Sequence, residues 1–169
     1  MTSSAGVPPL DPQVLRATFG RFPTGVVAVC GLVDGAPVGF AASTFVPVSL
    51  DPPLVSFCVQ HTSKTWPRLV GLPSLGLSVL GEGHESAARG LAARSGDRFS
   101  GLGLQTSAAG AVFLHGSSAW LECTVRDQLT AGDHAIVLLD VQGLLSHDIE
   151  PLVFHNSSFR LLAPTPDLG

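Results

Sequence analysis

The sequence predicts a mostly β fold with a few helices, arranged as one barrel in a single domain. Its 169 residues suit one domain with a sizeable core, and 45% of them are hydrophobic. The 19 glycines and 13 prolines interrupt the chain at short intervals, and six or seven of the apolar runs between them have the length of strands. We expect the domain to cover residues 11–163, between a disordered tail at 1–10 and a short tail at 164–169.

The first element is predicted to be a helix that starts after Asp11. Aspartate is a favourable N-cap, and Pro12 suits the first helical position because its ring presets φ. Apolar residues recur on one face as far as Phe22, which predicts a helix to that point, and Pro23 ends it.

Three strands are predicted next. A valine-rich run at 24–33 is typical of a buried strand, and the Asp-Gly pair at 34–35 is a turn that returns the chain as a hairpin strand over 37–45. The segment 46–53 holds three prolines, so we expect an extended or turned link there. The third strand covers 54–59.

The middle of the chain is predicted to alternate between short helices and strands. Thr65 is a plausible N-cap for a short helix that opens at Trp66. A strand at 75–80 precedes a second helix within 82–94, whose alanines and leucine share one face. The segment 102–116 is rich in small residues and is predicted as coil with one short strand.

The C-terminal third contains the clearest alternation. Apolar and polar residues alternate over 118–129, which predicts a strand, and Ala-Gly-Asp at 131–133 predicts the turn that follows it. A long apolar strand is expected over 134–145, and a final piece lies at 152–162.

Charge and hydropathy exclude two classes of partner. The net charge is −4, and the nine lysines and arginines are scattered rather than gathered in a stripe that would bind nucleic acid. No apolar run approaches the roughly 18 residues that a membrane helix needs. The first ten residues lack the basic and apolar regions of a signal peptide. We therefore expect a cytoplasmic protein that binds neither nucleic acid nor membranes.

Cysteine and histidine spacing argues against a metal site. Cys30, Cys58 and Cys123 lie far apart in apolar runs, with no CxxC pair, which indicates free thiols in a reducing compartment. The six histidines show no spacing typical of metal ligands, and no metal is expected.

Small hydroxyl residues gather in the stretch 38–66, between its predicted strands. A plain apolar core has no need of them, whereas a site for a flat ligand with a polar edge and a phosphate does. Ser63, Lys64 and Thr65 directly precede a predicted helix, where free N–H groups and a positive charge favour an anion. The alternative is that these groups are strand hydroxyls, a helix cap and a solvated lysine.

Seven segments run in the order found in one known family and cover about residues 13–162. They are FGRFPTGVVAV at 19–29, GFAASTFVPVSLDPPLV at 39–55, SKTW at 63–66, FSG at 99–101, AWLEC at 119–123, GDHAIV at 132–137 and LVFHNSSFRLL at 152–162. With these segments the sequence resembles the flavin reductase-like family of the FMN-binding split β-barrel fold. Its members are small reductase components of two-component flavin-dependent monooxygenases, and the resemblance implies a single, Greek-key-like split barrel.

The resemblance also implies a set of cofactor-binding residues. The isoalloxazine ring is expected beside the slim strand around Ala42 and the proline-restricted loop around Ser49, whose backbone N–H groups would face the polar edge of the ring. The flavin phosphate is expected at the SKTW segment. The residues assigned to cofactor binding are Thr24, Ser43, Thr44, Val48, Ser49, Leu50, Ser63, Lys64, Thr65 and Phe154.

One side chain is assigned to catalysis. The family histidine that matches His134 lies on the nicotinamide side of the flavin, which implies that His134 orients the nicotinamide or the N5 region of the flavin by hydrogen bonding. A general base is not required, because hydride transfer depends mainly on proximity and orientation. A purely structural histidine is the alternative.

Two departures from the family pattern affect ligand binding. Family members often have tyrosines in the C-terminal segment, where this chain has Phe154 and Phe159, and the chain contains no tyrosine. Phenylalanine keeps the stacking surface and loses the hydroxyl. The T-A-S-S of the flavin strand is here Ala41 to Thr44, so one hydroxyl is missing.

The resemblance implies an NAD(P)H:flavin oxidoreductase that transfers a hydride from NADH or NADPH to FMN or FAD and supplies reduced flavin to a partner monooxygenase. It also implies a homodimer that shares the flavin site. The alternatives are a tight flavoprotein with oxidase or monooxygenase activity, a non-catalytic flavin carrier and a generic apolar-ligand barrel. The sequence does not distinguish FMN from FAD as the flavin. No arginine cluster marks a site for the 2′-phosphate of NADPH, which favours NADH.

Overall fold

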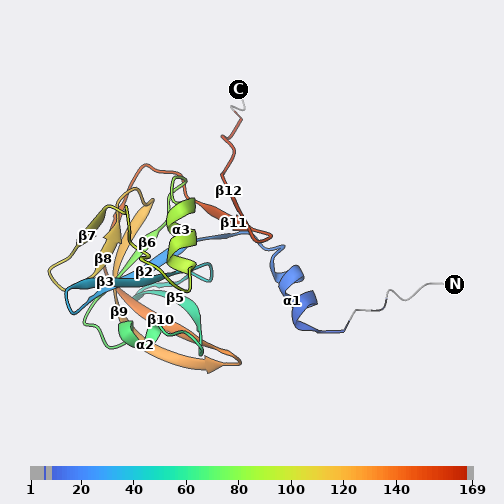
Figure 1. The fold of residues 1–169 in the computed structure, drawn as a ribbon, viewed down its shortest axis with the longest axis horizontal. Coiled ribbons are helices and arrows are strands. Elements are labelled where there is room, and N and C mark those ends of the chain that lie inside the picture. The colour runs from blue at the N-terminus through green and yellow to red at the C-terminus, as the bar shows by residue number, and fades with distance from the viewer. Residues whose placement is uncertain (1–5, 7–8, 167–169) are drawn as a thin grey trace.

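The computed structural model describes residue 6 and residues 9–166, and it is mostly β (Figure 1). Most of the expected tails, namely residues 1–5, 7–8 and 167–169, lies outside the described residues. The elements are α1 (Pro12–Phe19), β1 (Thr24–Gly25), β2 (Val27–Val33), β3 (Ala36–Ala42), β4 (Val46–Leu50), β5 (Pro53–Gln60), α2 (Trp66–Leu69), β6 (Leu75–Val79), α3 (Glu85–Ala92), β7 (Leu104–Thr106), β8 (Val112–Leu114), β9 (Ala119–Ala131), β10 (His134–Ser146), β11 (Val153–His155) and β12 (Ser158–Arg160).

Seven antiparallel strands form the main sheet, in the order β3-β2-β6-β9-β10-β5-β4. The long hairpin of β9 and β10 lies at its centre, and register shifts at Leu138/Leu139 and Val141/Gly143 mark irregularities of the kind that bend a strand. The expected split-barrel fold is confirmed, with more strands than the sequence predicted.

The barrel is split between β3 and β5. No ladder joins these two strands in the described part of the chain, and the side chain of Thr44, which follows β3, bonds across to β5. The Thr44 Oγ1 atom accepts a hydrogen bond from the Cys58 N–H at 2.9 Å and donates one to the Cys58 carbonyl at 3.2 Å. A side chain therefore replaces the strand pairing at the place where the barrel opens.

Strand β2 is buried on both faces, which explains its continuous apolar run. Val27 and Val29 point into the barrel and pack with residues of β5, β6 and β10, including Phe57. Ala28 and Cys30 point outward and pack beneath α3 and β8. An uninterrupted apolar strand is the pattern expected where both faces of a sheet are covered.

Three aromatic rings close the barrel interior near α2. Phe40, Phe57 and Trp66 meet edge to face with ring centroids 5.4–6.4 Å apart. The Trp66 indole N–H donates to the Gln128 side chain at 2.8 Å, so α2 is tied to β9 as well as to the core.

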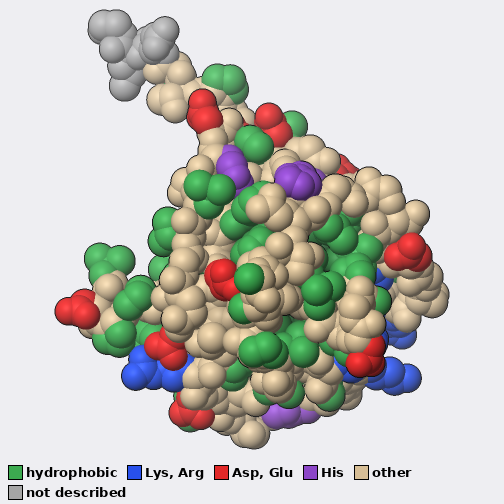
Figure 2. Space-filling view, turned by 90° about the vertical axis from the view of Figure 1, so that its left-hand side faces the viewer, with side chains coloured by type: hydrophobic (Ala, Val, Ile, Leu, Met, Phe, Trp, Pro, Cys, Tyr) green, Lys and Arg blue, Asp and Glu red, His purple; other side chains and the backbone are tan. Residues whose placement is uncertain are grey.

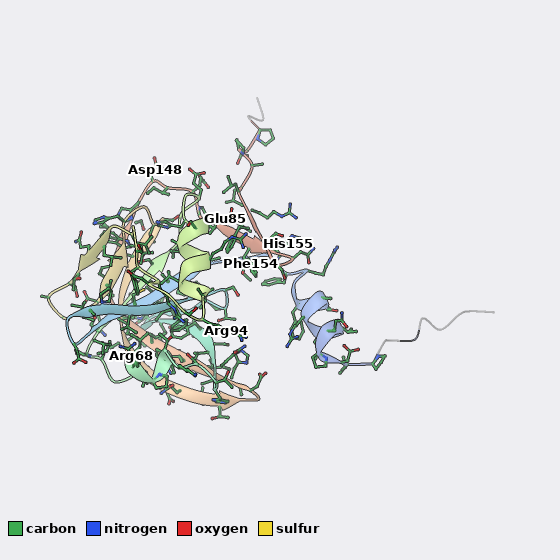
Figure 3. The ribbon with its side chains drawn as sticks, in the orientation of Figure 1. Arg68, Glu85, Arg94, Asp148, Phe154 and His155 are labelled. Atoms are coloured by element: carbon green, nitrogen blue, oxygen red, sulfur yellow. The ribbon has the colours of Figure 1, made fainter. Side chains whose placement is uncertain are left out.

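Two small sheets flank the main one. The C-terminal hairpin of β11 and β12 pairs with β1, where Thr24 lies opposite Phe154. Figure 3 shows Phe154 and His155 on the side of the molecule that faces α1. Phe154 packs on Phe159, and the Arg89 guanidinium of α3 lies 4.9 Å from the Phe159 ring centroid. The second small sheet pairs β7 with β8.

The predicted start of the N-terminal helix is confirmed, and its predicted end lies too far along the chain. The Asp11 carboxylate accepts hydrogen bonds from the backbone N–H groups of Gln13 and Val14, both at 2.9 Å. The helix ends at Phe19, not Phe22, and none of its side chains is buried. Figure 1 shows α1 lying away from the barrel, so the predicted apolar face lacks a partner among the residues that the structure describes.

Three strand predictions need correction. The predicted strand over 24–33 is divided, because β1 pairs with β11 and only β2 belongs to the barrel. The predicted link over 46–53 contains β4, an edge strand that pairs with β5 alone, and an edge tolerates proline because half of its N–H groups need no partner. The segment 102–116 holds two short strands, not one.

Other predictions are confirmed. Asp34 and Gly35 have φ values of 52° and 76°, which fits the primed hairpin turn between β2 and β3. The alternation of β9 holds: Leu121 and Cys123 face the barrel interior, and Trp120 packs outside it on Phe113. On the face drawn in Figure 2, Lys and Arg side chains lie at the lower left and along the right-hand side.

Candidate functional site

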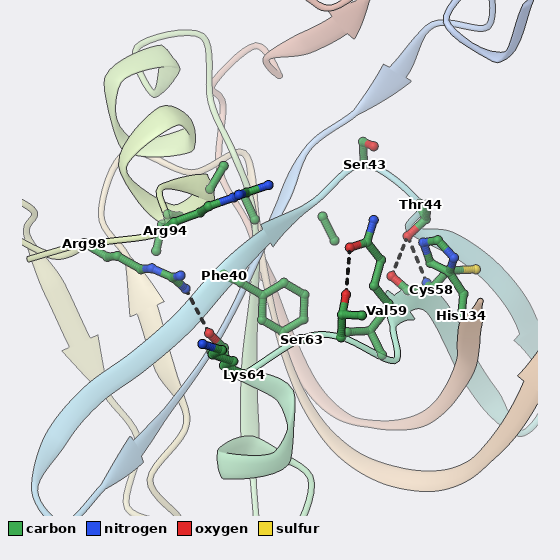
Figure 4. A pocket seen from close by; sticks show the side chains of 17 residues that line it. Phe40, Ser43, Thr44, Cys58, Val59, Ser63, Lys64, Arg94, Arg98 and His134 are labelled. Carbon is green, nitrogen blue, oxygen red and sulfur yellow. Dashed lines mark hydrogen bonds between the residues drawn. The ribbon is translucent and has the colours of Figure 1, made fainter. Parts of the chain in front are cut away.

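A cavity of about 720 Å³ opens where the barrel is split. This volume lies within the roughly 300–1,000 Å³ typical of cofactor and small-molecule sites. Its walls come from the end of β3, from β5 and the turn after it, from the end of α3 and the loop that follows, and from the start of β10 (Figure 4). The lining residues are Phe40, Ala41, Ala42, Ser43, Thr44, Cys58, Val59, Gln60, Thr62, Ser63, Lys64, Thr65, Leu91, Ala92, Arg94, Arg98 and His134.

The β3 wall is slim. Ala41 and Ala42 line the cavity with methyl groups only, so a flat ligand can approach the backbone closely. Ser43 also faces the cavity. The Thr44 hydroxyl is different, because its one proton is used in the hydrogen bond to the Cys58 carbonyl. Thr44 therefore bonds across the split, and its assignment to cofactor binding stays a prediction.

The turn after β5 carries the polar residues expected at the phosphate. The Ser63 Oγ atom accepts from the Trp66 N–H at 3.1 Å and so caps α2. Thr65 occupies the N-cap position of α2, as predicted, and its side chain makes no capping bond. With only four residues, α2 also contributes little dipole, so the expected phosphate site depends on side chains.

The Thr65 hydroxyl instead receives a hydrogen bond from Arg98. The Arg98 Nη1 atom donates to Thr65 Oγ1 at 3.0 Å and to the Gly39 carbonyl at 2.9 Å. Because Thr65 accepts here, its own O–H remains able to donate into the cavity. Arg98 is anchored by two bonds and keeps further N–H donors for a ligand.

One part of the cavity wall is strongly cationic. Lys64, the only lysine of the chain, lines it together with Arg94 and Arg98, and none of the aspartates and glutamates that the structure describes does. Among the described residues none of these three cations forms an ion pair within the chain. In a protein of net charge −4, three of the nine basic residues are thus free to attract an anionic ligand.

His134 lines the cavity where β10 begins. Its Nδ1 atom lies 2.6 Å from the Oδ1 atom of Asp133, which is almost fully exposed. The hydrogen bond from His134, followed by the attraction between the two charges, lowers the pKa of the Asp133 carboxyl below its ordinary value of 3.8. The imidazole is therefore held by its neighbour in the chain.

The structure brings together six of the residues that the sequence predicted for the site. They are Ser43, Thr44, Ser63, Lys64, Thr65 and His134.

The other five do not line the cavity. Val48, Ser49 and Leu50 lie on the edge strand β4, where Leu50 is 96% exposed. Thr24 and Phe154 are register partners in the small sheet, and the Thr24 hydroxyl is buried without a hydrogen-bond partner. These five assignments remain predictions.

Three residues of the site were missed. Arg94 and Arg98 come from the loop after α3, and the only sequence signal near them was the family segment FSG at 99–101, directly after Arg98. Asp133 was read as part of a turn. Both arginines lie some 30 positions from Lys64 in the sequence, so no local sequence pattern predicts that the three side chains share one cavity.

No metal cluster accompanies these residues. The described part of the chain holds no group of three or more His, Cys, Asp or Glu side chains that could hold a metal ion. None of its helices is long and apolar enough to cross a membrane. Burial raises the pKa of the Cys30 and Cys123 thiols to about 12, whereas Cys58 lines the cavity.

A split barrel whose opening combines a slim strand with cations that form no ion pair suits a flat cofactor that carries a phosphate. The family described as "Flavin reductase like domain" matches residues 19–163. The chain belongs to this flavin reductase-like family.

Several relatives and solved structures are similar over most of this chain. The chain is 33% identical to the flavin-dependent monooxygenase reductase subunit HsaB of Rhodococcus jostii, over 92% of this chain and 80% of HsaB. It is 39% identical to the actinorhodin polyketide dimerase of Streptomyces coelicolor, over 79% of this chain and 76% of that protein. The structure of the Streptomyces globisporus NADH:FAD oxidoreductase SgcE6, in complex with NAD and FAD fragments, superposes with a TM-score of 0.89 at 38% identity, covering 96% of this chain and 99% of that one.

Proposed function

We propose that this protein is an NAD(P)H:flavin oxidoreductase that transfers a hydride from NADH or NADPH to FMN or FAD. The observation that carries the proposal is the cavity at the barrel split, where a strand of small residues lies close to three cations that have no acidic partner. An isoalloxazine ring needs a slot with little side-chain bulk, and a flavin phosphate needs donors and positive charge. Relatives named as the reductase subunit of a flavin-dependent monooxygenase and as a flavin reductase support the same assignment.

The residues of the turn after β5 bind the flavin phosphate in this proposal. Lys64 and Arg98 supply charge, and Thr65 supplies an O–H donor that Arg98 orients. The backbone from Ala41 to Ser43 borders the ring. A bound flavin supplies the hydride acceptor, and the protein contributes the proximity and orientation that make the transfer fast.

His134 orients the nicotinamide or the N5 side of the flavin. It lies on the cavity wall, and its Nδ1 atom is occupied by Asp133, so the remaining ring nitrogen, Nε2, is available to a ligand. A fixed imidazole can position a ligand without exchanging a proton during hydride transfer.

The reduced flavin is passed to a partner monooxygenase. HsaB is the reductase subunit of such an enzyme, and BorF, 33% identical with a TM-score of 0.84, is the flavin reductase component of a two-component tryptophan halogenase. Diffusible transfer requires modest flavin affinity, and a cavity open to solvent at the barrel split suits release. We place the protein in the cytoplasm, with residues 11–163 as its functional domain.

The protein acts as a homodimer in this proposal. Exposed apolar side chains of the described residues include Phe19 and Phe22 in the α1 region, which are 70% and 76% exposed, and Leu50 on the β4 edge. A second copy that covers β4 also places the predicted ring-contact residues 48–50 at a shared interface.

Light scattering tests the dimer. We expect twice the 17.4 kDa mass of one chain, and a monomer for Leu50→Ser. Leu144→Ser, another exposed leucine on a different strand, is the matched control and keeps the dimer. A wild-type monomer that still binds flavin contradicts the proposal.

Absorbance of NADH tests the activity. The protein is mixed with NADH and excess FMN, and the assay is repeated with FAD and with NADPH. Rapid, protein-dependent loss of the nicotinamide band is the expected result, and it ranks the four combinations. Flavin binding by fluorescence quenching without NADH oxidation would point to the flavin carrier, and a protein that stays yellow and unreduced to a tight flavoprotein.

A further inference from the structure

The three cations of the cavity belong to two separate groups. Arg98 is tied to the turn after β5 through Thr65, and Lys64 is part of the same turn. Arg94 comes from the loop after α3, is exposed, and makes no hydrogen bond or ion pair with the described residues. In Figure 4 the Arg98 guanidinium points to the turn, whereas the Arg94 side chain extends away from it, across the cavity toward the β3 wall.

One phosphate monoester is satisfied by the first group alone. Its three oxygens can be met by the charge of Lys64, by the free N–H donors of Arg98 and by the Thr65 hydroxyl. Arg94 then remains as a planar donor fork over the cavity with no anion in reach. An FMN-sized ligand leaves this charge unused.

We infer that Arg94 is a specificity-determining residue that binds the second phosphate of a dinucleotide flavin, so that the site prefers FAD to FMN. This inference rests on the proposed flavin reductase function. In this inference, Lys64, Thr65 and Arg98 bind the phosphate nearest the ribityl chain, and Arg94 binds the phosphate beyond it. The adenosine part of FAD then leaves the cavity past the end of α3.

The electrostatic setting supports the division. The described acidic residues all lie outside the cavity lining, so a diphosphate meets no like charge from them. A ligand phosphate therefore does not have to displace Arg94 from a competing carboxylate.

Dissociation constants for FAD, FMN and riboflavin, measured by flavin fluorescence at fixed ionic strength, test the inference. For Arg94→Gln we expect FAD to bind roughly fivefold or more weakly, because a charge-assisted hydrogen bond is lost at an exposed site. The FMN and riboflavin constants stay within about twofold. Lys64→Gln weakens FMN and FAD together and leaves riboflavin unchanged.

Arg68→Gln is the matched control. Arg68 lies on α2, only a few residues from the turn, is exposed, and does not line the cavity (Figure 3). The Arg68→Gln substitution removes the same charge as Arg94→Gln, and no flavin dissociation constant should change by more than about twofold. Arg94→Lys restores the charge without the planar fork and should recover part of the FAD affinity.

Three results would overturn the inference. Equal weakening of FMN and FAD by Arg94→Gln would place Arg94 on the single flavin phosphate, and no change in either would remove it from the site. An effect confined to the KM for NADPH, with NADH unaffected, would assign Arg94 to a 2′-phosphate. A wild-type protein that binds no flavin is a separate outcome, since it refutes the proposed function itself.

Discussion

The Nδ1 atom of His134 lies 2.6 Å from the Oδ1 atom of Asp133, its neighbour in the chain. A carboxylate can only accept, so Nδ1 carries the proton in this pair. The arrangement sets the imidazole in one orientation at the edge of the cavity and leaves Nε2 for a ligand. Asp133 is thus a positioning residue for the one side chain that we assign to catalysis.

Asp133→Asn should lower kcat for NADH oxidation by roughly five- to tenfold, because an amide that donates to Nδ1 permits the other tautomer of His134. The FMN dissociation constant should stay within about twofold, since Asp133 does not line the cavity. Stopped-flow reduction and fluorescence titration measure the two quantities. Asp148→Asn, at an exposed site elsewhere, is the control, and an unchanged kcat would contradict the role of Asp133.

The same pair predicts a change in acid stability. Since the pKa of Asp133 is lowered in the folded chain, its contribution to stability is present above the unfolded value, about 3.9, and is lost as the pH falls through the lowered folded value. Unfolding midpoints of wild type and Asp133→Asn should therefore converge below about pH 4. In a His134→Asn background the difference should not depend on pH, and a pH-dependent difference there would assign the effect to another group.

Ser43 and Thr44 should separate ligand binding from stability. Thr44→Val leaves the exposed backbone of Cys58 without its two side-chain bonds, so we expect the free energy of unfolding to fall by about 1 kcal/mol. Ser43→Ala should leave stability unchanged and weaken FMN binding roughly threefold. Urea unfolding and fluorescence titration distinguish them, and the reverse pattern would show that Thr44 serves the ligand.

The three cysteines should differ in reactivity. Burial raises the pKa of Cys30 and Cys123 to about 12, and the charges of Glu122 and Asp140 add to the effect at Cys123. Because the thiolate is the nucleophile, neither should react with iodoacetamide at pH 8 in the folded protein. Mass spectrometry should find only Cys58 labelled, more slowly with FMN present, and all three labelled in urea. Modified Cys30 in the folded protein would contradict the burial.

Gly76→Ala should destabilise the fold strongly. A Cβ atom at Gly76 would lie 2.1 Å from the Val112 carbonyl oxygen, and backbone on β8 cannot move aside without breaking the packing of β6. We expect a loss of about 2 kcal/mol or more in urea unfolding. Gly71→Ala is the control, because a Cβ there meets nothing within 4 Å, and it should change stability by less than about 0.5 kcal/mol.

Local signals were read correctly where the physics acts over a few residues. The Asp11 cap, the Asp34-Gly35 turn and the alternation along β9 each depend on hydrogen bonds or φ values within a short stretch. The family motifs extended this reading to the barrel fold and to the six site residues that do meet at the cavity. Cap chemistry and strand period belong to the sequence itself.

Tertiary structure decided the rest. The curl of the sheet brings Lys64 to the same cavity as Arg94 and Arg98, and it separates Thr24 from the strand that follows. It also leaves Val48 and Leu50 on an exposed edge. These placements depend on pairings between strands that are distant in the sequence, such as β9 with β6 and β1 with β11. The residues of a strand and its sequence neighbours do not indicate which distant strand it pairs with.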